Sequence, residues 1–147
     1  MIVWDESMST GDSRLDAQHR MLFQKFNEFS EIVERRIDVR EAAGEVLDFL
    51  QFYAIWHFGQ EEECMHKHQC PVAAANKNAH EEYKKMFGEF YLRWQENTMD
   101  LTLALETHER LAEWIRRHVI STDTRLRPCL PQTEPRTDSA QPASQNP

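Results

Sequence analysis

The sequence predicts an all-α protein: an antiparallel up-down four-helix bundle with an N-terminal loop and a disordered C-terminal tail. Two observations lead to this fold class. Apolar residues recur every three or four positions along most of the chain, as on the buried face of a helix, and no alternating run of useful length indicates a strand. Four such segments follow one another through short connections, which favours antiparallel neighbours in a bundle.

The bundle is expected to occupy residues 1–126, because a chain of 147 residues with 40% hydrophobic composition can bury one core. Residues 127–147 are expected to form a disordered tail rich in Pro, Ser and Gln. Five of the six prolines lie at or beyond Pro128, and almost no apolar residue follows that could be buried.

The first helix is expected to begin after the letters TGDS, with Asp12 or Ser13 as its cap. A second helix should begin near Asp38, because DVRE places a glutamate three residues after the aspartate. The expected core-facing residues of the first helix are Leu15, His19, Leu22, Phe26, Phe29 and Val33. Those of the second helix are Val46, Leu50, Ala54, His57, Glu61, Cys64 and His68.

The letters QCP interrupt the pattern, and Pro71 is well placed to start the third helix. The letters ENTMD then predict a turn before the fourth helix. The expected core-facing residues of these two helices are Asn76, His80, Tyr83, Phe87, Phe90 and Trp94, then Leu105, His108, Leu111, Ile115, His118 and Val119. For His108 we expect packing or surface exposure rather than metal ligation, and for Gly59 and Gly88 the only reason we find is close packing.

The formal net charge of −8 argues against nucleic acid or an anionic membrane as a partner, since both require clustered Lys and Arg. The first ten residues lack the basic start and apolar run of a signal peptide. No stretch approaches about 18 consecutive apolar residues, which a membrane span requires. We therefore expect a cytoplasmic protein, and the sequence carries no signal for its oligomeric state.

The cysteines are odd in number and show no CxxC spacing, so unpaired thiols in a reducing compartment are expected rather than a disulfide framework. They are Cys64, Cys70 and Cys129. Cys64 is expected to be a small core residue, and a redox role is the alternative.

Polar residues fall on the predicted core faces in an unusual number. His57 and Glu61 are four residues apart, one turn along the face that also carries Leu50 and Ala54. Each of the four helices contributes an inward histidine, and Glu61 and Asp123 add carboxylates. The four histidines are His19, His57, His80 and His118.

So many buried polar groups need a shared counter-charge, which a metal centre supplies. Imidazoles with carboxylates suit iron, manganese or zinc, and two carboxylates able to bridge favour a pair of ions. Glu62, Glu63 and Lys67 fall off the core stripe and are expected to be solvated. His118 and Asp123 are five residues apart, roughly 140° around an ideal helix, so either the helix widens there or Asp123 reaches around.

These motifs resemble those of the hemerythrin family in its bacterial single-domain form, over residues 4–126. The resemblance rests on LDAQH ending at His19, HFGQEE beginning at His57, the histidine at 80, and WIRRHVISTD ending at Asp123. It implies a non-haem, carboxylate-bridged pair of iron ions. One iron would take His19 and His57, Glu61 and Asp123 would bridge, and the other iron would take His80, His118 and one further histidine.

The family function implied is reversible binding of dioxygen or another small diatomic ligand for storage, delivery or sensing. The alternatives are a redox enzyme that handles peroxide or nitric oxide through an extra open coordination site, and a metal-poor structural module. No catalytic residue is assigned.

The sequence departs from the family pattern four residues before His80, where Asn76 stands in place of the further histidine. Asn76 is either a weak oxygen ligand or leaves a vacancy. His68 is no substitute, because seven residues beyond Glu61 places it roughly 10 Å along the helix axis. The His80/His118 iron is therefore expected to be held more weakly and to be more exposed to added ligands.

Overall fold

The computed structural model describes residues 1–131 of the chain, and these residues contain helices and no strands. Four long helices form the body: α1 (Ser13–Glu34), α3 (Gly44–Lys67), α4 (Ala73–Gln95) and α5 (Leu101–Ile115). A 3-10 turn η1 (Glu6–Met8) precedes them, and a short α2 (Val39–Ala42) joins α1 to α3. The chain then continues from α5 as a π-helical segment η2 (Arg116–Thr122) and a 3-10 turn η3 (Asp123–Leu126).

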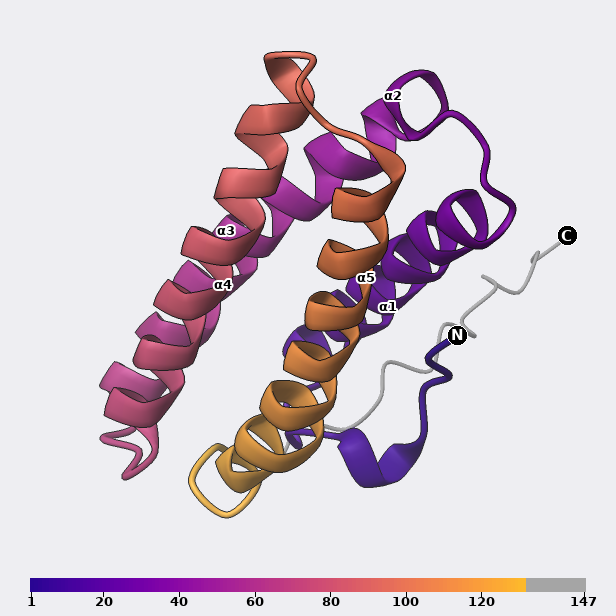
Figure 1. The fold of residues 1–147 in the computed structure, drawn as a ribbon. Coiled ribbons are helices and arrows are strands. Elements are labelled where there is room, and N and C mark those ends of the chain that lie inside the picture. Colours follow the sequence, from indigo (N-terminus) through magenta and orange to yellow (C-terminus); the bar gives the residue numbers. More distant parts are fainter. Residues whose placement is uncertain (132–147) are drawn as a thin grey trace, which may run out of the picture.

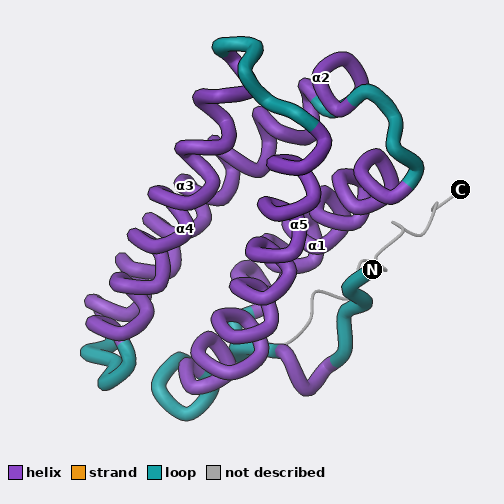
Figure 2. Tube along the Cα trace, in the orientation of Figure 1, coloured by secondary structure: helices purple, strands orange, loops and turns teal. Residues whose placement is uncertain are grey.

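The long helices are arranged as an antiparallel bundle, which confirms the predicted fold class (Figure 1). Helix α1 packs against α3 and α5, and α4 packs against α3 and α5, so each helix has two long neighbours. Short loops connect successive helices at the ends of the bundle (Figure 2). Within residues 1–131 no helix combines the length and the apolar composition that a bilayer span requires.

Aspartate side chains cap three helices at the places where the chain turns. Asp12 Oδ1 accepts hydrogen bonds from the backbone N–H groups of Arg14 and Leu15, at 2.8 and 3.1 Å, which confirms it as the cap of α1. Asp38 is also a cap, but of α2 only. The predicted second helix is divided, because the chain bends at Ala43 before α3 begins. Helix α4 begins two residues after Pro71 rather than at it.

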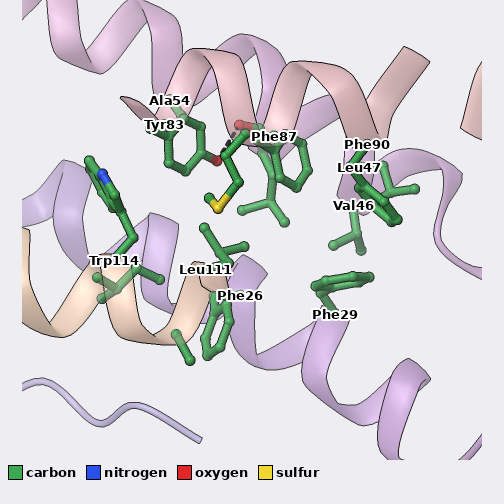
Figure 3. Close-up of a cluster of buried hydrophobic side chains, with 14 of the residues drawn as sticks. Phe26, Phe29, Val46, Leu47, Ala54, Tyr83, Phe87, Phe90, Leu111 and Trp114 are labelled. Atoms are coloured by element: carbon green, nitrogen blue, oxygen red, sulfur yellow. Dashed lines mark hydrogen bonds between the residues drawn. The ribbon is translucent and has the colours of Figure 1, made fainter. Parts of the chain in front are cut away.

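The apolar core lies between the four long helices and is rich in aromatic rings (Figure 3). Full burial of one large apolar side chain, such as phenylalanine or leucine, stabilises the fold by about 1.5–3 kcal/mol. The fully buried residues of this core include Phe26, Phe29, Leu47, Leu50, Phe58, Phe87 and Leu111. One predicted core residue is wrong: Leu105 is 39% exposed, and Ala104 takes the inward position.

His108 packs as expected, with its ring stacked on Phe26 at 5.2 Å between centroids and its Nε2 2.8 Å from Ser30 Oγ. The close packing expected at Gly59 and Gly88 is wrong. A Cβ atom added to either glycine would meet nothing within 4 Å in the described part of the chain.

The expectation that all three cysteines are unpaired is wrong for two of them. Cys70, in the α3–α4 loop, forms a disulfide with Cys129, and their Cα atoms lie 5.7 Å apart. Cys64 remains a buried free thiol, in the small cluster that also contains Met65 and Leu126. Spacing in sequence gave no sign of this pair, because 59 residues separate its members.

Residues 127–131 belonged to the predicted tail, yet they contact the bundle. Leu130 is only 4% exposed, and the disulfide at Cys129 ties this segment to the α3–α4 loop. Residues 132–147, the rest of the predicted tail, lie outside the described residues.

Candidate metal centre

All six predicted ligand side chains meet at one place inside the bundle, and Asn76 lies among them. Helix α1 supplies His19, α3 supplies His57 and Glu61, α4 supplies Asn76 and His80, and the segment after α5 supplies His118 and Asp123. Each of the seven residues is at most 3% exposed. Periodicity placed all of them except Asp123 on core faces, and Asp123 joins them through the turn described below.

Glu61 stands between two groups of side chains. Its Oε2 lies 3.1 Å from Nε2 of His57 and 3.3 Å from Nε2 of His19. Its other oxygen, Oε1, lies 3.6 Å from Nε2 of His80 and accepts a hydrogen bond from Nδ2 of Asn76 at 2.5 Å. Oε2 of this carboxylate thus faces the imidazoles of His19 and His57, whereas Oε1 faces His80 and Asn76.

Asp123 divides its oxygens in the same way. Oδ2 lies 3.3 Å from Nε2 of His19, whereas Oδ1 lies 3.1 Å from Nε2 of His118 and 3.2 Å from Nδ2 of Asn76. Two positions result. We call the one beside His19 and His57 the first position, and the one beside His80, His118 and Asn76 the second position. Each has donor atoms close enough together to surround a metal ion.

A widened turn places Asp123 over His118. The backbone N–H of Asp123 donates to the carbonyl of His118, five residues back, as in a π-helix. In an ordinary α-helix the two side chains would diverge by roughly 140°. Of the two explanations left open by the sequence, the widened helix is confirmed.

Two polar residues that the sequence analysis missed support the histidines from outside. Nδ1–H of His57 donates to Oε1 of Gln18 at 2.7 Å, and Nδ1 of His80 lies 2.9 Å from Oε1 of Glu62. Glu62 was expected to be solvated, which is wrong, because α4 places His80 beside it. The only signal in the sequence was that Gln18 and Glu62 are next to His19 and Glu61.

Aromatic rings fix the orientation of the histidines at the second position. Phe58 stacks on His80 with ring centroids 4.0 Å apart, and Trp114 stacks on His118 at 4.4 Å. Nε1 of Trp114 in turn donates to the carbonyl of Ala79, one residue before His80, at 3.0 Å. Neither imidazole can swing out of the cluster without displacing a buried aromatic ring.

Burial and the mutual contacts of the charged groups together set the pKa values in the cluster. It lowers the pKa of His57 and of His118 to about 4 each, so both imidazoles are neutral near pH 7. Burial, together with the charge on Glu61, raises the pKa of Asp123 well above its usual range. Burial acts in the same direction on Glu61, but contacts with the histidines, His19 foremost, hold the pKa of Glu61 well below its usual range. Burial opposes a proton on His19, yet the carboxylates of Glu61 and Asp123 outweigh burial and raise the pKa of His19.

The donor atoms face one another at distances that suit a cation between them. In their neutral forms His57 and His80 carry the proton on Nδ1, because Gln18 and Glu62 accept there, and Nε2 is then an acceptor. Yet Nε2 of His57 lies 3.1 Å from Oε2 of Glu61. Nε2 of His80 lies 3.1 Å from Nε2 of His118, close enough for one shared proton or one cation to join the two nitrogens. Lone pairs at these separations repel unless a positive charge lies between them.

Buried polar atoms without hydrogen-bond partners surround the first position. Within the described residues, Nε2 of His19, Oε2 of Glu61 and Oδ2 of Asp123 are buried with no hydrogen-bond partner, and all three face the first position. Leaving a polar group unpaired in the interior costs about 1–3 kcal/mol. One cation at that position would serve all three atoms, so the residues present fit a metal centre.

A small apolar cavity of about 20 Å³ adjoins the cluster, which is room for about one water-sized molecule. Several of its lining residues are within about one helical turn of a clustered histidine along the chain. The residues that line it are Leu22, Phe23, Leu50, Ala54, Phe58, Tyr83, Leu111, Trp114, Ile115 and Val119. Such a lining favours an apolar guest over water.

The chain matches the family model described as the hemerythrin HHE cation binding domain over residues 10–130. It is 32% identical over 123 residues to a bacteriohemerythrin of Stenotrophomonas maltophilia (strain R551-3), covering 84% of this chain and 77% of that protein. It is 26% identical over 124 residues to a bacteriohemerythrin of Pseudomonas aeruginosa (strain LESB58), covering 83% and 76%.

Solved structures agree on the fold. A crystal structure of wild-type hemerythrin superposes with a TM-score of 0.78 at 23% identity, covering 88% of this chain and 98% of that chain. The family match extends over most of the bundle and includes every residue of the histidine–carboxylate cluster. The chain therefore belongs to the hemerythrin family, whose characteristic domain binds cations.

Proposed function

We propose that this protein binds dioxygen reversibly at a pair of non-haem iron ions. The observation that carries the proposal is the division of Glu61 and Asp123, each of which turns one oxygen toward either metal position. Two carboxylates that share their oxygens between two sets of imidazoles are suited to bridge two cations. Family membership supports iron as the metal.

His19 and His57 would hold the first iron, His80 and His118 would hold the second, and Glu61 and Asp123 would offer an oxygen to each. Asn76 lies at the second position. When bound, a pair of ferrous ions can supply the electrons with which dioxygen is held reversibly.

The rest of the site orients the ligands and limits access by water. Gln18 and Glu62 accept the Nδ1 protons of His57 and His80, which turns the Nε2 lone pairs inward and makes the imidazoles better donors. The adjoining cavity is apolar and large enough for one small molecule. A diatomic gas enters such a space without losing hydrogen bonds to water, whereas ions and polar oxidants do lose them.

The test is reconstitution of the purified chain with ferrous iron under argon, followed by cycles of air and argon. We expect about two irons per chain and a visible absorption that appears in air and fades under argon over repeated cycles. Rapid bleaching with consumption of added peroxide would replace the proposal with the enzyme alternative. A colourless chain that retains no iron would indicate the metal-poor module.

Matched variants show whether the signal comes from this cluster. His57→Leu removes a first-position ligand, whereas His66→Leu removes an exposed histidine from the same helix. We expect the first variant to lose the visible absorption and the second to retain it. Equal absorption in both variants would place the iron elsewhere.

A further inference from the structure

At Asn76 this chain departs from the histidine pattern of the family, and the contacts of this side chain indicate a role at the second metal position. The side chain is completely buried on the inner face of α4. Nδ2 donates to Oε1 of Glu61 at 2.5 Å and to Oδ1 of Asp123 at 3.2 Å, and it lies 3.3 Å from Sδ of Met65. Oδ1 of Asn76 has no hydrogen-bond partner among the described residues.

The amide occupies the place of a ligand at the second position. With metal–ligand bonds of about 2.1 Å, neighbouring donor atoms around one cation lie about 3 Å apart. The two Nε2 atoms of His80 and His118 are 3.1 Å apart, and Nε2 of His118 is 3.1 Å from Oδ1 of Asp123. The Asn76 amide lies at comparable distances from the two carboxylates. It therefore completes the ring of donor atoms rather than leaving a gap.

Rotation of the amide by half a turn about its Cβ–Cγ bond would exchange its two ends. Nδ2 then leaves the carboxylates, and Oδ1 takes its place facing the cation. Without a cation, the N–H groups donate hydrogen bonds to the two carboxylates; with a cation, the carbonyl oxygen would be the metal ligand. An amide can serve both states because it carries a donor and an acceptor at similar distances.

The exchange of an imidazole for an amide oxygen changes the kind of metal that the second position favours. Its donors become two imidazole nitrogens and three oxygens, from Glu61, Asp123 and Asn76. Carbonyl and carboxylate oxygens suit manganese, whereas imidazole nitrogens suit iron and zinc. The first position has no neutral oxygen donor of this kind among its neighbours, so the two positions differ in chemistry.

We propose that Asn76 ligates the second cation through Oδ1, and that this oxygen shifts the preference of the second position from iron toward manganese. Supplied with iron alone, the centre would hold the iron pair proposed above; supplied with both metals, it would keep iron at the first position and take up manganese at the second. The proposal deepens the function proposed above and rests on the two metal positions assigned there.

The experiment supplies metal-free protein with equimolar ferrous and manganous ions under argon, removes excess ions, and measures the bound metals by elemental analysis. We expect the wild-type chain to retain manganese at the second position beside iron at the first, in a clearly higher proportion than Asn76→His does. Asn76→His should take up two irons, with a manganese-to-iron ratio lower by about tenfold or more. Electron paramagnetic resonance gives a second readout, because a manganese ion coupled to iron loses the spectrum of an isolated manganese ion.

Asn78→His is the matched control, because Asn78 is an exposed asparagine two residues further along α4. It adds the same side chain to the same helix and should keep the wild-type ratio. Circular dichroism checks that each variant is folded. If Asn76→His does not fold, Asn76→Leu, which lacks any donor, should retain the first cation and lose the second.

Two irons without manganese in the wild-type chain would overturn the inference, and so would an unchanged ratio in Asn76→His or full retention of both cations in Asn76→Leu. These outcomes leave the binding of a metal pair intact. The reverse failure is also recognisable. A chain that holds one iron and one manganese but shows no reversible response to air would keep the Asn76 assignment and refute dioxygen binding.

Discussion

The disulfide between Cys70 and Cys129 allows a prediction whose magnitude follows from the structure. The bridge joins the α3–α4 loop to the segment directly after η3, and 59 residues separate the two cysteines. Closing a loop of this length in the unfolded chain removes about 14 cal/mol/K of entropy, or about 4 kcal/mol at 25 °C. We therefore expect the double variant Cys70→Ser/Cys129→Ser to lose about 4 kcal/mol of unfolding free energy.

The assay is urea unfolding of the metal-free protein, followed by far-ultraviolet circular dichroism, with and without a thiol-free reductant. The wild-type chain should lose stability on reduction, whereas the double variant should not respond. Cys64→Ala, which removes the buried free thiol, should still respond. A thiol assay on denatured, unreduced protein should find one thiol per chain. A stability difference below about 1 kcal/mol, or three reactive thiols, would refute the reasoning.

Three further predictions concern residues away from the bridge. Gly59→Ala and Gly88→Ala should each raise the unfolding free energy by about 0.5–1 kcal/mol, because both glycines lie inside helices with open space for a Cβ atom. Thermal unfolding measures this gain, and a loss of stability would contradict the prediction. Gln18→Leu should weaken iron retention against a chelator by about tenfold or more, since His57 loses the acceptor that orients it, and unchanged retention would argue against that role. Burial lowers the pKa of His108 in the folded chain. Below a pH of about 6.5, the unfolded chain therefore binds a proton at this histidine more readily than the folded chain does. Stability should therefore fall as the pH drops from 7.5 to 5, and His108→Gln should reduce this fall; an identical pH profile would show that His108 does not contribute.

Much of the fold was predictable because it depends on local periodicity. The apolar and histidine residues of the four helices recur at helical spacing, and Asp12 precedes α1 in the way that a cap requires. Where the prediction failed, helical periodicity did not carry the information. The bend at Ala43 comes between two segments that are each helical by pattern, so the sequence showed one continuous helix. Leu105 was assigned inward by the same pattern, yet the rotation of α5 about its axis is set by its neighbours.

The sequence was sufficient to name the residues of the candidate site, but it was not sufficient to predict the contacts between their atoms. Five of the six predicted ligands were placed on core faces by pattern, and Asp123 was added through the family resemblance. The structure brings all six together, while their role as metal ligands stays a prediction. The position of Asp123 could not be decided, because the π-helical turn depends on how η2 packs and not on spacing alone. Glu62 was assigned to solvent because a helix stripe describes only one face, and His80 meets it from another helix.

By itself, the sequence determined that the chain forms helices, where the first of them begins, and that one histidine from each of the four predicted helices points inward. Those features depend on residues three or four positions apart, so the spacing of residues in the sequence reveals them. Only the tertiary structure decided which carboxylate oxygen faces which imidazole, how Asn76 completes the second position, and that Cys70 meets Cys129. These contacts join residues distant in the chain, and they depend on the rotation and offset of packed helices, which local spacing does not encode.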